Sequence, residues 1–513
     1  MMRRKYFTGV TVNHTLSLIV ASGFYLTNGL DDVQAAETNS YTRQPFSAYS
    51  SQTDDALLGS GKYEKPVWNL HDTLKLPKWL SLSVNQRTRY ESLSGSFTPR
   101  STGGDQQIAL QTDVWLAAKF GKFSAATEFL DARALLADTG SKTLSNSHVD
   151  TADFIQGYVS WADQNVLHSG IGAEVKVGRQ TLDYGGRRLV ARNTFRNTIN
   201  SFTGLNMRFL NYDKWQFNAF VTMPVIRYPQ GTDTPELINN DGNMDREDVH
   251  TLFSGGFLEL PNLAWGINSE AYLYHLDESD SNTNPTRNRR YITPGVRFYI
   301  KPAKAKFDFQ AEAMGQFGTV RATTNATDKR NIQHEAWSNH FDMGYTFDVP
   351  WSPRFALEYD YASGNNSNNP NLDQRFDPLY GVRRVDFGPT GIYGAFSRSN
   401  INTPGYRINA APRSDVQLSF AHKFLWLASS TDCWGGANCS STSTSTTLWD
   451  TTGRSGSYAG QQLDLSARWD VNSSLNLESG WAHLFKGEFA KKAPSAPNGQ
   501  DIDYFYVQSQ LRF

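Results

Sequence analysis

A run of arginines is the sharpest chemical signal in this sequence. Between residues 179 and 196 a single acid, Asp183, stands against five of them: Arg179, Arg187, Arg188, Arg192 and Arg196. A guanidinium is permanently charged and can bind carboxylate or phosphate through two parallel hydrogen bonds. In a loop over a pore, such a cluster would attract anionic solutes. The alternative is an external loop that contacts lipopolysaccharide phosphate. The sequence supports solute selection and lipopolysaccharide contact equally.

Two other loops hold residues that could do chemistry. Residues 239–248 are rich in acids, but Arg246 stands where an EF-hand register starting at Asp241 needs glycine. We expect an acidic surface loop there and no metal site, with weak divalent-ion binding as the alternative. The chain has only two cysteines, Cys433 and Cys439. In a long loop of an exported protein, this spacing predicts a local disulfide.

Catalytic motifs are scarce. Residues 59–62 read Gly-Ser-Gly-Lys but lack the earlier glycine and the following Ser or Thr of a phosphate-binding loop, and no Gly-x-Ser-x-Gly elbow occurs. A barrel enzyme would need a histidine beside a serine or an acid at the rim. Strand alternation places His275, His422 and His483 on lipid-facing or interfacial positions. We therefore expect no catalytic residue and no cofactor, and keep an outer-membrane enzyme and an adhesive or structural barrel as rival classes.

Composition indicates what must position these residues. The 513-residue chain carries a net charge of −1 and is only 39% hydrophobic, yet 13% of its residues are aromatic and 40 are glycine. A chain that is polar on average and crowded with aromatic residues is typical of a large outer-membrane β-barrel. The near-neutral charge offers no general attraction to nucleic acid.

Strict alternation of polar and apolar residues predicts eighteen antiparallel strands. Their connections are short and long in turn, which is the outer-membrane arrangement of short periplasmic turns and long extracellular loops. A barrel of this width encloses an aqueous lumen unless loops fill it. The predicted strands are 79–92, 107–120, 122–133, 149–163, 172–180, 198–211, 213–223, 249–260, 263–276, 288–301, 304–317, 335–347, 353–363, 402–411, 414–428, 458–470, 473–486 and 501–513.

The alternation also assigns charged residues of both signs to the lumen. Opposite charges on a hydrated wall pair with each other, and for any single residue a solvated wall position is the expected role. The arginines placed on the solute path outside the cluster are Arg87, Arg89, Arg208, Arg297 and Arg354.

Both ends of the chain carry export signals. A basic start (Arg3, Arg4 and Lys5), an apolar run over 16–30 and small residues at 33–36 predict a signal peptide over 1–35. Residues 36–77 are expected to form a partly disordered periplasmic segment, and 78–513 the barrel. No later apolar run approaches the roughly 20 residues of a spanning helix. The last strand alternates to Phe513, which predicts recognition by the barrel-assembly machinery.

Several stretches, in this order along the chain, resemble the alginate-export family of outer-membrane barrels. They are Leu82–Glu91, Phe129–Arg133, Val175–Gln180 followed by the Asn-rich run Asn193–Phe209, and Arg375–Tyr380. The resemblance covers about residue 80 to the C-terminus and implies an eighteen-stranded porin that exports an acidic polysaccharide. It implies anion selectivity from inward arginines, with Arg87, Arg89 and Arg179 on matching stretches. Thr181 stands where the family's type member has a second arginine.

Together these observations predict a monomeric passive channel in the outer membrane of a Gram-negative bacterium. It would contact outer-membrane lipid and lipopolysaccharide and favour small or oligomeric anionic or sugar-like solutes. The alternative is a general or nutrient-specific uptake porin for small organic acids.

Overall fold

The computed structural model describes residues 66–211, 214–280, 285–325, 327–366, 369–434, 447–497 and 499–513. The chain divides into two units, Met1–Glu37 and Thr38–Phe513, and all described residues belong to the second. The predicted signal peptide and most of the predicted segment 36–77 lie outside them.

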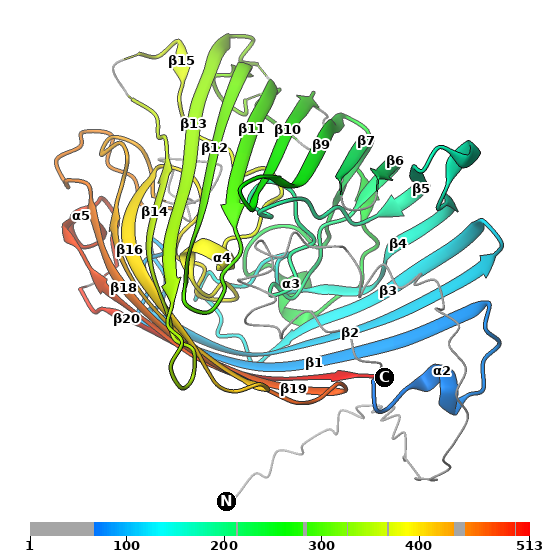
Figure 1. The fold of residues 1–513 in the computed structure, drawn as a ribbon. Coiled ribbons are helices and arrows are strands. Elements are labelled where there is room, and N and C mark those ends of the chain that lie inside the picture. The colour runs from blue at the N-terminus through cyan, green and yellow to red at the C-terminus, as the bar shows by residue number, and fades with distance from the viewer. Residues whose placement is uncertain are drawn as a thin grey trace, which may run out of the picture. The chain divides into compact units, whose positions relative to one another are not determined.

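Eighteen long antiparallel strands form a closed wall within the described residues (Figure 1). Each strand pairs with the next along the chain, and β20 pairs back with β1 from Asn85↔Arg512 to Ser94↔Asp503. The wall strands are β1 (Leu80–Ser94), β2 (Gly104–Phe120), β3 (Phe123–Leu135), β4 (Asp150–Asp163), β5 (Gly172–Gln180), β6 (Phe202–Asn211), β7 (Trp215–Ile226), β9 (Thr251–Ala264), β10 (Ile267–Glu278), β11 (Arg290–Ile300), β12 (Lys306–Arg321), β13 (Asn331–Thr346), β14 (Arg354–Ala362), β16 (Ile401–Arg413), β17 (Val416–Trp426), β18 (Tyr458–Asn472), β19 (Leu475–Lys486) and β20 (Ile502–Arg512).

Every predicted strand corresponds to one wall strand, so the predicted eighteen-stranded barrel is confirmed. Most predicted boundaries differ from the observed ones by a few residues. The predicted strand 198–211 begins later, at Phe202, because residues 198–201 turn into the lumen. Two further strands, β8 (Arg246–Glu247) and β15 (Leu372–Asp373), are two-residue pairings beside the wall.

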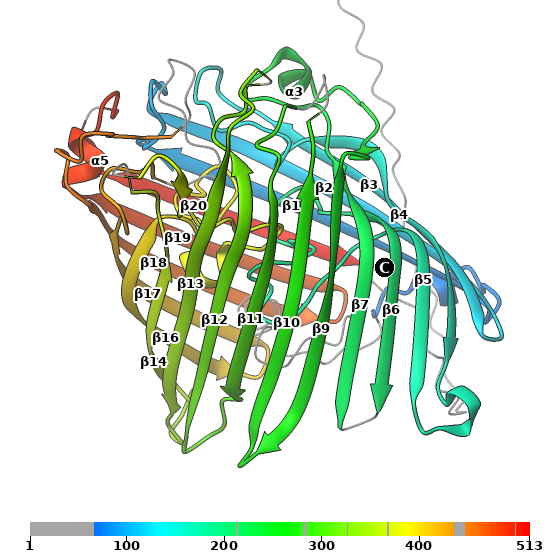
Figure 2. The ribbon, with the colours of Figure 1, turned by 90° about the horizontal axis from the view of Figure 1, so that it is seen from above.

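The connections separate by length onto the two ends of the barrel. Short turns such as 265–266 and 414–415 lie at one end, and in Figure 2 those after β9 and β11 are at the lower edge. The opposite end carries α3 (Pro235–Asn239) and α5 (Glu488–Lys492); the other short helices are α2 (Leu70–Thr73), η1 (Val166–His168) and α4 (Arg384–Phe387). Among the described residues, no helix has the length and apolar character to cross a membrane.

The outer face of the wall is apolar. On β14, the outward Phe355, Leu357 and Tyr359 are 42%, 51% and 37% exposed, whereas the alternate residues Glu358 and Asp360 are buried. Exposed aromatic rings gather near the short turns, as in an interfacial girdle that sits at lipid headgroups. They are Trp79, Phe120, Phe123, Trp265, Phe307, Phe347, Trp351 and Trp469. This face fits hydrocarbon, with aromatic rings at its border.

The residues before β1 lie at the seam where β20 meets β1. The backbone N–H of Trp68 donates to Ser474 Oγ at 2.9 Å, and its ring lies 6.1 Å from the ring of Phe513. The backbone of Phe513 in turn exchanges hydrogen bonds with Val84 on β1. The described part of the N-terminal segment is therefore folded against the turn end of the barrel.

Two long connections fold into the barrel instead of standing outside it. We name residues 181–201 the first inward segment, and 363–400, apart from 367 and 368, the second. They pair with each other: Tyr380 N–H donates to Leu189 O at 2.9 Å, and Ala191 N–H donates to Tyr380 O at 3.2 Å. Figure 1 shows α4, part of the second segment, inside the ring of strands. The sequence predicted both as long connections at the extracellular end and left open whether loops fill the lumen; the structure brings both inside.

One of the two cysteines of the predicted disulfide, Cys433, lies in the described part of the chain. Cys433 is fully buried, and its carbonyl accepts hydrogen bonds from Arg375 (3.1 Å) and Asn400 (3.0 Å). Cys439 lies outside the described residues, so the pairing stays a prediction. We expect the non-reduced peptide to be two hydrogen masses lighter by mass spectrometry, with little change in stability on reduction because the closed loop is short. Two free thiols in the exported protein would contradict the pairing.

Candidate functional site

Arg87 and Arg89 on β1 point into the lumen and hold the first inward segment. Arg87 donates to the carbonyl oxygens of Thr194 (2.6 Å) and Arg196 (3.0 Å). Arg89 donates to Phe195 O at 2.7 Å and to Glu91 Oε1 at 2.6 Å. These two predicted solute-path arginines therefore fix a backbone across the lumen.

Three arginines of the predicted cluster are buried in ion pairs. Arg187, Arg188 and Arg192 are 1%, 2% and 5% exposed. Arg187 Nε donates to Asp183 at 2.9 Å, and Arg192 donates to Glu128 on β3 at 2.9 Å. Their burial contradicts the alternative in which these side chains contact lipopolysaccharide, because that contact requires exposed guanidiniums.

Arg188 joins both inward segments to the wall. Its guanidinium donates to Glu312 on β12 at 2.6 Å and to both carboxylate oxygens of Asp386 on α4 at 3.0 Å. Burial alone would raise the pKa of Asp386, but Arg188 and Arg398 outweigh it and hold the pKa below its usual range. Asp386 is therefore ionised at neutral pH, where it pairs with both guanidiniums.

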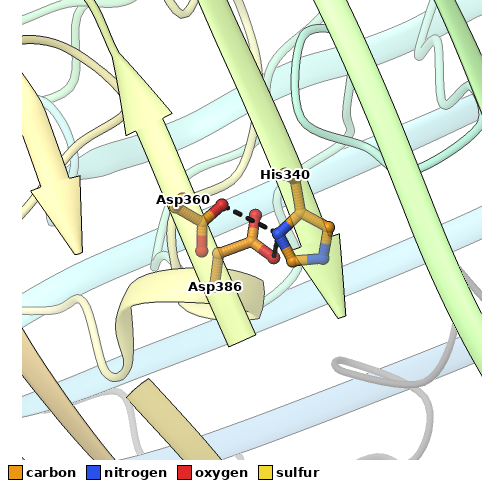
Figure 3. Close-up of side chains that lie close together, drawn as sticks. All are labelled: His340, Asp360 and Asp386. Carbon is orange, nitrogen blue, oxygen red and sulfur yellow. Dashed lines mark hydrogen bonds and ion pairs between the residues drawn. The ribbon is translucent and has the colours of Figure 1, made fainter. Parts of the chain in front are cut away.

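His340 on β13, Asp360 on β14 and Asp386 converge in the same place (Figure 3). His340 Nδ1 lies 2.8 Å from Asp360 Oδ1 and 3.6 Å from Asp386 Oδ1. Arg398 donates to Asp360 at 3.0 Å and also pairs with Asp386. The spacing of the three side chains would suit a metal ion, but Arg188 and Arg398 already supply positive charge to both carboxylates.

The same triad resembles catalytic groups only superficially. The second ring nitrogen of His340, Nε2, lies 3.2 Å from the side-chain nitrogen of Gln310. Among the described residues, the hydrogen-bond partners of the ring are Asp360 and Gln310. A Ser-His-Asp arrangement would instead place a hydroxyl at one ring nitrogen. The alternation of β10, β17 and β19 puts His275, His422 and His483 on the outward face, as predicted.

The remaining predicted arginines divide between the two faces of the wall. Arg208 pairs with Glu174 (2.9 Å), Arg297 with Glu270 (2.7 Å) and Arg354 with Asp308 on the lumen face. Arg179, by contrast, shares its face of β5 with Val177, which is 51% exposed.

The guanidinium of Arg179 donates to Glu247 Oε1 at 2.7 Å and to Phe154 O at 2.9 Å. The expectation that Arg179 lies on the solute path is therefore wrong. Alternating residues of a strand point to opposite faces, and the lumen face here carries Lys176 instead.

Arg196, Arg227 and Arg383 form a group of a different kind, which we name the arginine trio. Arg196 (2.5 Å) and Arg227 (2.6 Å) both donate to Asn200 Oδ1, so two guanidiniums meet at one amide oxygen. Arg383 comes from the second inward segment and donates to Gly394 O at 3.4 Å. Among the described residues, no carboxylate lies within the 4.0 Å of an ion pair with any of the three.

The three guanidiniums of the trio lie close enough to repel one another, and the acids Asp150 and Asp245 act on them from beyond ion-pair distance. Burial, and after it repulsion from Arg227 and Arg383, lowers the pKa of Arg196 well below its usual value, with Asp150 as the opposing charge. Burial lowers the pKa of Arg383 as well. Sequence reasoning found Arg196 but missed Arg227 and Arg383. Arg227 directly follows β7, and Arg383 belongs to a long connection that has no strand alternation to show which way its side chain points.

A comparison with family models matches residues 78–501 to the model described as alginate export. No curated protein matches the chain. Among solved structures, OccD3 (OpdP) of Pseudomonas aeruginosa is 13% identical with a TM-score of 0.52, covering 85% of this chain and 91% of that one.

Two further solved structures have the same fold. OccAB3 of Acinetobacter baumannii is 11% identical with a TM-score of 0.51, covering 85% of this chain and 99% of that one. The outer-membrane protein opdK of Pseudomonas aeruginosa is 11% identical with a TM-score of 0.51, covering 84% and 98%. At these identities the likeness shows the fold alone.

Proposed function

The chain belongs to the alginate export family, and we propose that this outer-membrane channel favours anionic or sugar-like solutes. The protein is a barrel of the Gram-negative outer membrane through which solutes pass passively. Its preference among solutes is what remains to be assigned. The arginine trio carries the proposal, because it is the place in the described lumen where guanidiniums meet without an ion-paired acid.

Most of the buried lumen arginines have their charge balanced by a neighbouring acid. Arg187, Arg188, Arg192, Arg297 and Arg354 are matched by acids within ion-pair distance, so their fields largely cancel a short way off. Arg196 and Arg227 share only a neutral amide oxygen. An incoming carboxylate or sulfate would satisfy guanidinium donors that Asn200 cannot neutralise, and a guanidinium fork suits such an anion.

Replacing the trio together by glutamine (R196Q, R227Q and R383Q) should shift the channel's selectivity toward cations. Glutamine keeps a hydrogen-bond donor toward Asn200 but removes the charge. In planar bilayers under a KCl gradient, we expect the ratio of chloride to potassium permeability to fall several-fold. The shift should be largest at low salt, because charges are screened beyond about 10 Å at 0.1 M.

The matched control removes three exposed arginines from the outer loops: R100Q, R330Q and R454Q. This variant loses the same net charge and should keep the reversal potential of the wild type. An equal shift in both variants, or no shift in either, would contradict the assignment of selectivity to the trio.

One observation favours the uptake of small organic acids over the export of a polymer. Both inward segments cross the lumen and are held there by buried ion pairs. Liposome swelling separates the two, because small carboxylates would enter quickly and oligomeric uronates slowly or not at all. An outer-membrane enzyme would need a further nucleophile beside His340, and we propose a channel without catalytic residues or a cofactor.

Further assignments belong to the proposal. Residues 1–35 serve as a signal peptide, 36–77 as a periplasmic segment and 78–513 as the barrel. The protein acts as a monomer surrounded by lipid and lipopolysaccharide. The alternating last strand, ending in Phe513, is offered to the barrel-assembly machinery during insertion.

A further inference from the structure

Three buried carboxylates meet near the loop end of β4. Asp150 and Asp153 come from the start of β4, and Asp245 from the connection between β7 and β9. One oxygen of each lies within 4.8 Å of the others, and the three side chains are buried. Asp245 belongs to the acidic stretch 239–248, for which the sequence predicted a surface loop, with weak divalent-ion binding as the alternative. The fold brings it to two acids almost a hundred residues earlier in the chain.

The contacts of the three carboxylates are unequal. Asp153 accepts hydrogen bonds from the backbone N–H groups of Asp245 and Phe154, each at 2.5 Å. Asp245 accepts one from the N–H of Tyr228 at 2.7 Å. Asp150 has no hydrogen-bond partner for either carboxylate oxygen among the described residues, although it is fully buried. Burying an ionised carboxylate without a partner is costly, so these two oxygens call for a ligand.

The neighbouring arginines do not supply that ligand. Arg196 and Arg227 act on Asp150 only at a distance, since their donors go to Asn200 and to backbone oxygens. Arg179 comes within 3.9 Å of Asp153 but donates to Glu247 and to carbonyl groups. The oxygens of Asp150 thus face the other two acids without a bonded donor.

We propose that Asp150, Asp153 and Asp245 together hold a calcium ion. The donor set is oxygen only, which suits a hard divalent cation, and it contains neither the histidine nor the cysteine that zinc prefers. The ion would tie the connection between β7 and β9 to the wall at β4. Arg196 and Arg227 of the arginine trio lie nearby and act on Asp150 by their charge, but their hydrogen bonds go elsewhere. The calcium proposal does not depend on the proposed solute preference.

The test uses the full chain refolded in detergent, free of lipopolysaccharide, which binds calcium itself. After dialysis against EDTA, titration calorimetry with CaCl2 should show one site in the wild type and binding at least tenfold weaker in Asp150→Asn. The matched control is Asp241→Asn, an exposed acid of the same loop, which should bind calcium like the wild type.

Thermal unfolding gives an independent readout. Calcium should raise the melting temperature of the wild type and of Asp241→Asn but not of Asp150→Asn. In EDTA, Asp150→Asn should be at least as stable as the wild type, because it removes a buried charge that lacks a partner. A purely structural role for Asp150 predicts the opposite, a less stable variant in EDTA. Wild-type protein without calcium binding, or Asp150→Asn with unchanged binding, would overturn the proposal.

Discussion

Replacing Asp386 by alanine should raise the single-channel conductance several-fold. Asp386 joins α4 to Arg188 of the first inward segment, to Arg398 of the second and to His340 on the wall. Its removal takes away one of the two acidic partners of each buried guanidinium, since Arg188 keeps Glu312 and Arg398 keeps Asp360. Breaking a buried ion pair completely costs about 3–5 kcal/mol, which is an upper bound here. The inward segments should then leave the lumen more often and open a wider path for ions.

A pair confined to the wall provides the control. Glu358 on β14 accepts from Arg407 on β16 at 2.6 Å and lies 2.9 Å from Lys423 on β17. Glu358→Ala also breaks a buried pair, but it releases neither inward segment. We expect Asp386→Ala to widen the channel and Glu358→Ala to keep a conductance near that of the wild type. If both variants lose stability and neither gains conductance, the segments are not what limits ion flow.

The second large effect should come from a charge on the lipid-facing wall. Leu357 lies midway along β14 and is 51% exposed. An arginine at the middle of the bilayer lowers barrel stability by about 2–4 kcal/mol, falling to about 0–1 kcal/mol near the interface. We therefore expect Leu357→Arg to be less stable than the wild type in lipid vesicles. A urea titration, with the folded fraction read from the heat-modifiable gel band, would measure the loss.

Phe307→Arg is the matched control for depth. Phe307 is the second residue of β12, close to the short-turn end, and is 72% exposed. Its replacement puts the same charge on the same face at the border of the hydrocarbon. Equal losses in the two variants would contradict the placement of the apolar band around Leu357.

The wall of the barrel could be predicted from the sequence because alternation with a period of two is a local property. On β14, the spacing of Arg354, Glu358 and Asp360 alone assigns them to one face of the strand, and all three are buried on the lumen side. The order of short and long connections then fixed the number of strands. For Arg179, the same alternation with Val177 held the correct answer, and the family resemblance led away from it.

The contents of the lumen could not be predicted in this way. A connection such as 181–201 has no periodicity, so nothing in its residues tells whether it stands outside or folds inward. The partners of Arg188 and Arg192 lie on β3, β12 and α4, up to about two hundred positions away along the chain. Such pairs depend on ring closure, and a single sequence carries no signal for them.

Ring closure by β1 and β20 has a consequence for the order of folding. The strand that completes the wall pairs with β19 on one side and β1 on the other, and Phe513 and Trp68 lie together at the join. Until β20 is in place, β1 and β19 each present a row of unpaired backbone groups, which is a template for aggregation. A chain cut short by its final dozen residues would keep almost all of its pairings and still have two open edges, so loss of these few residues should be far more harmful than loss of an equally long loop.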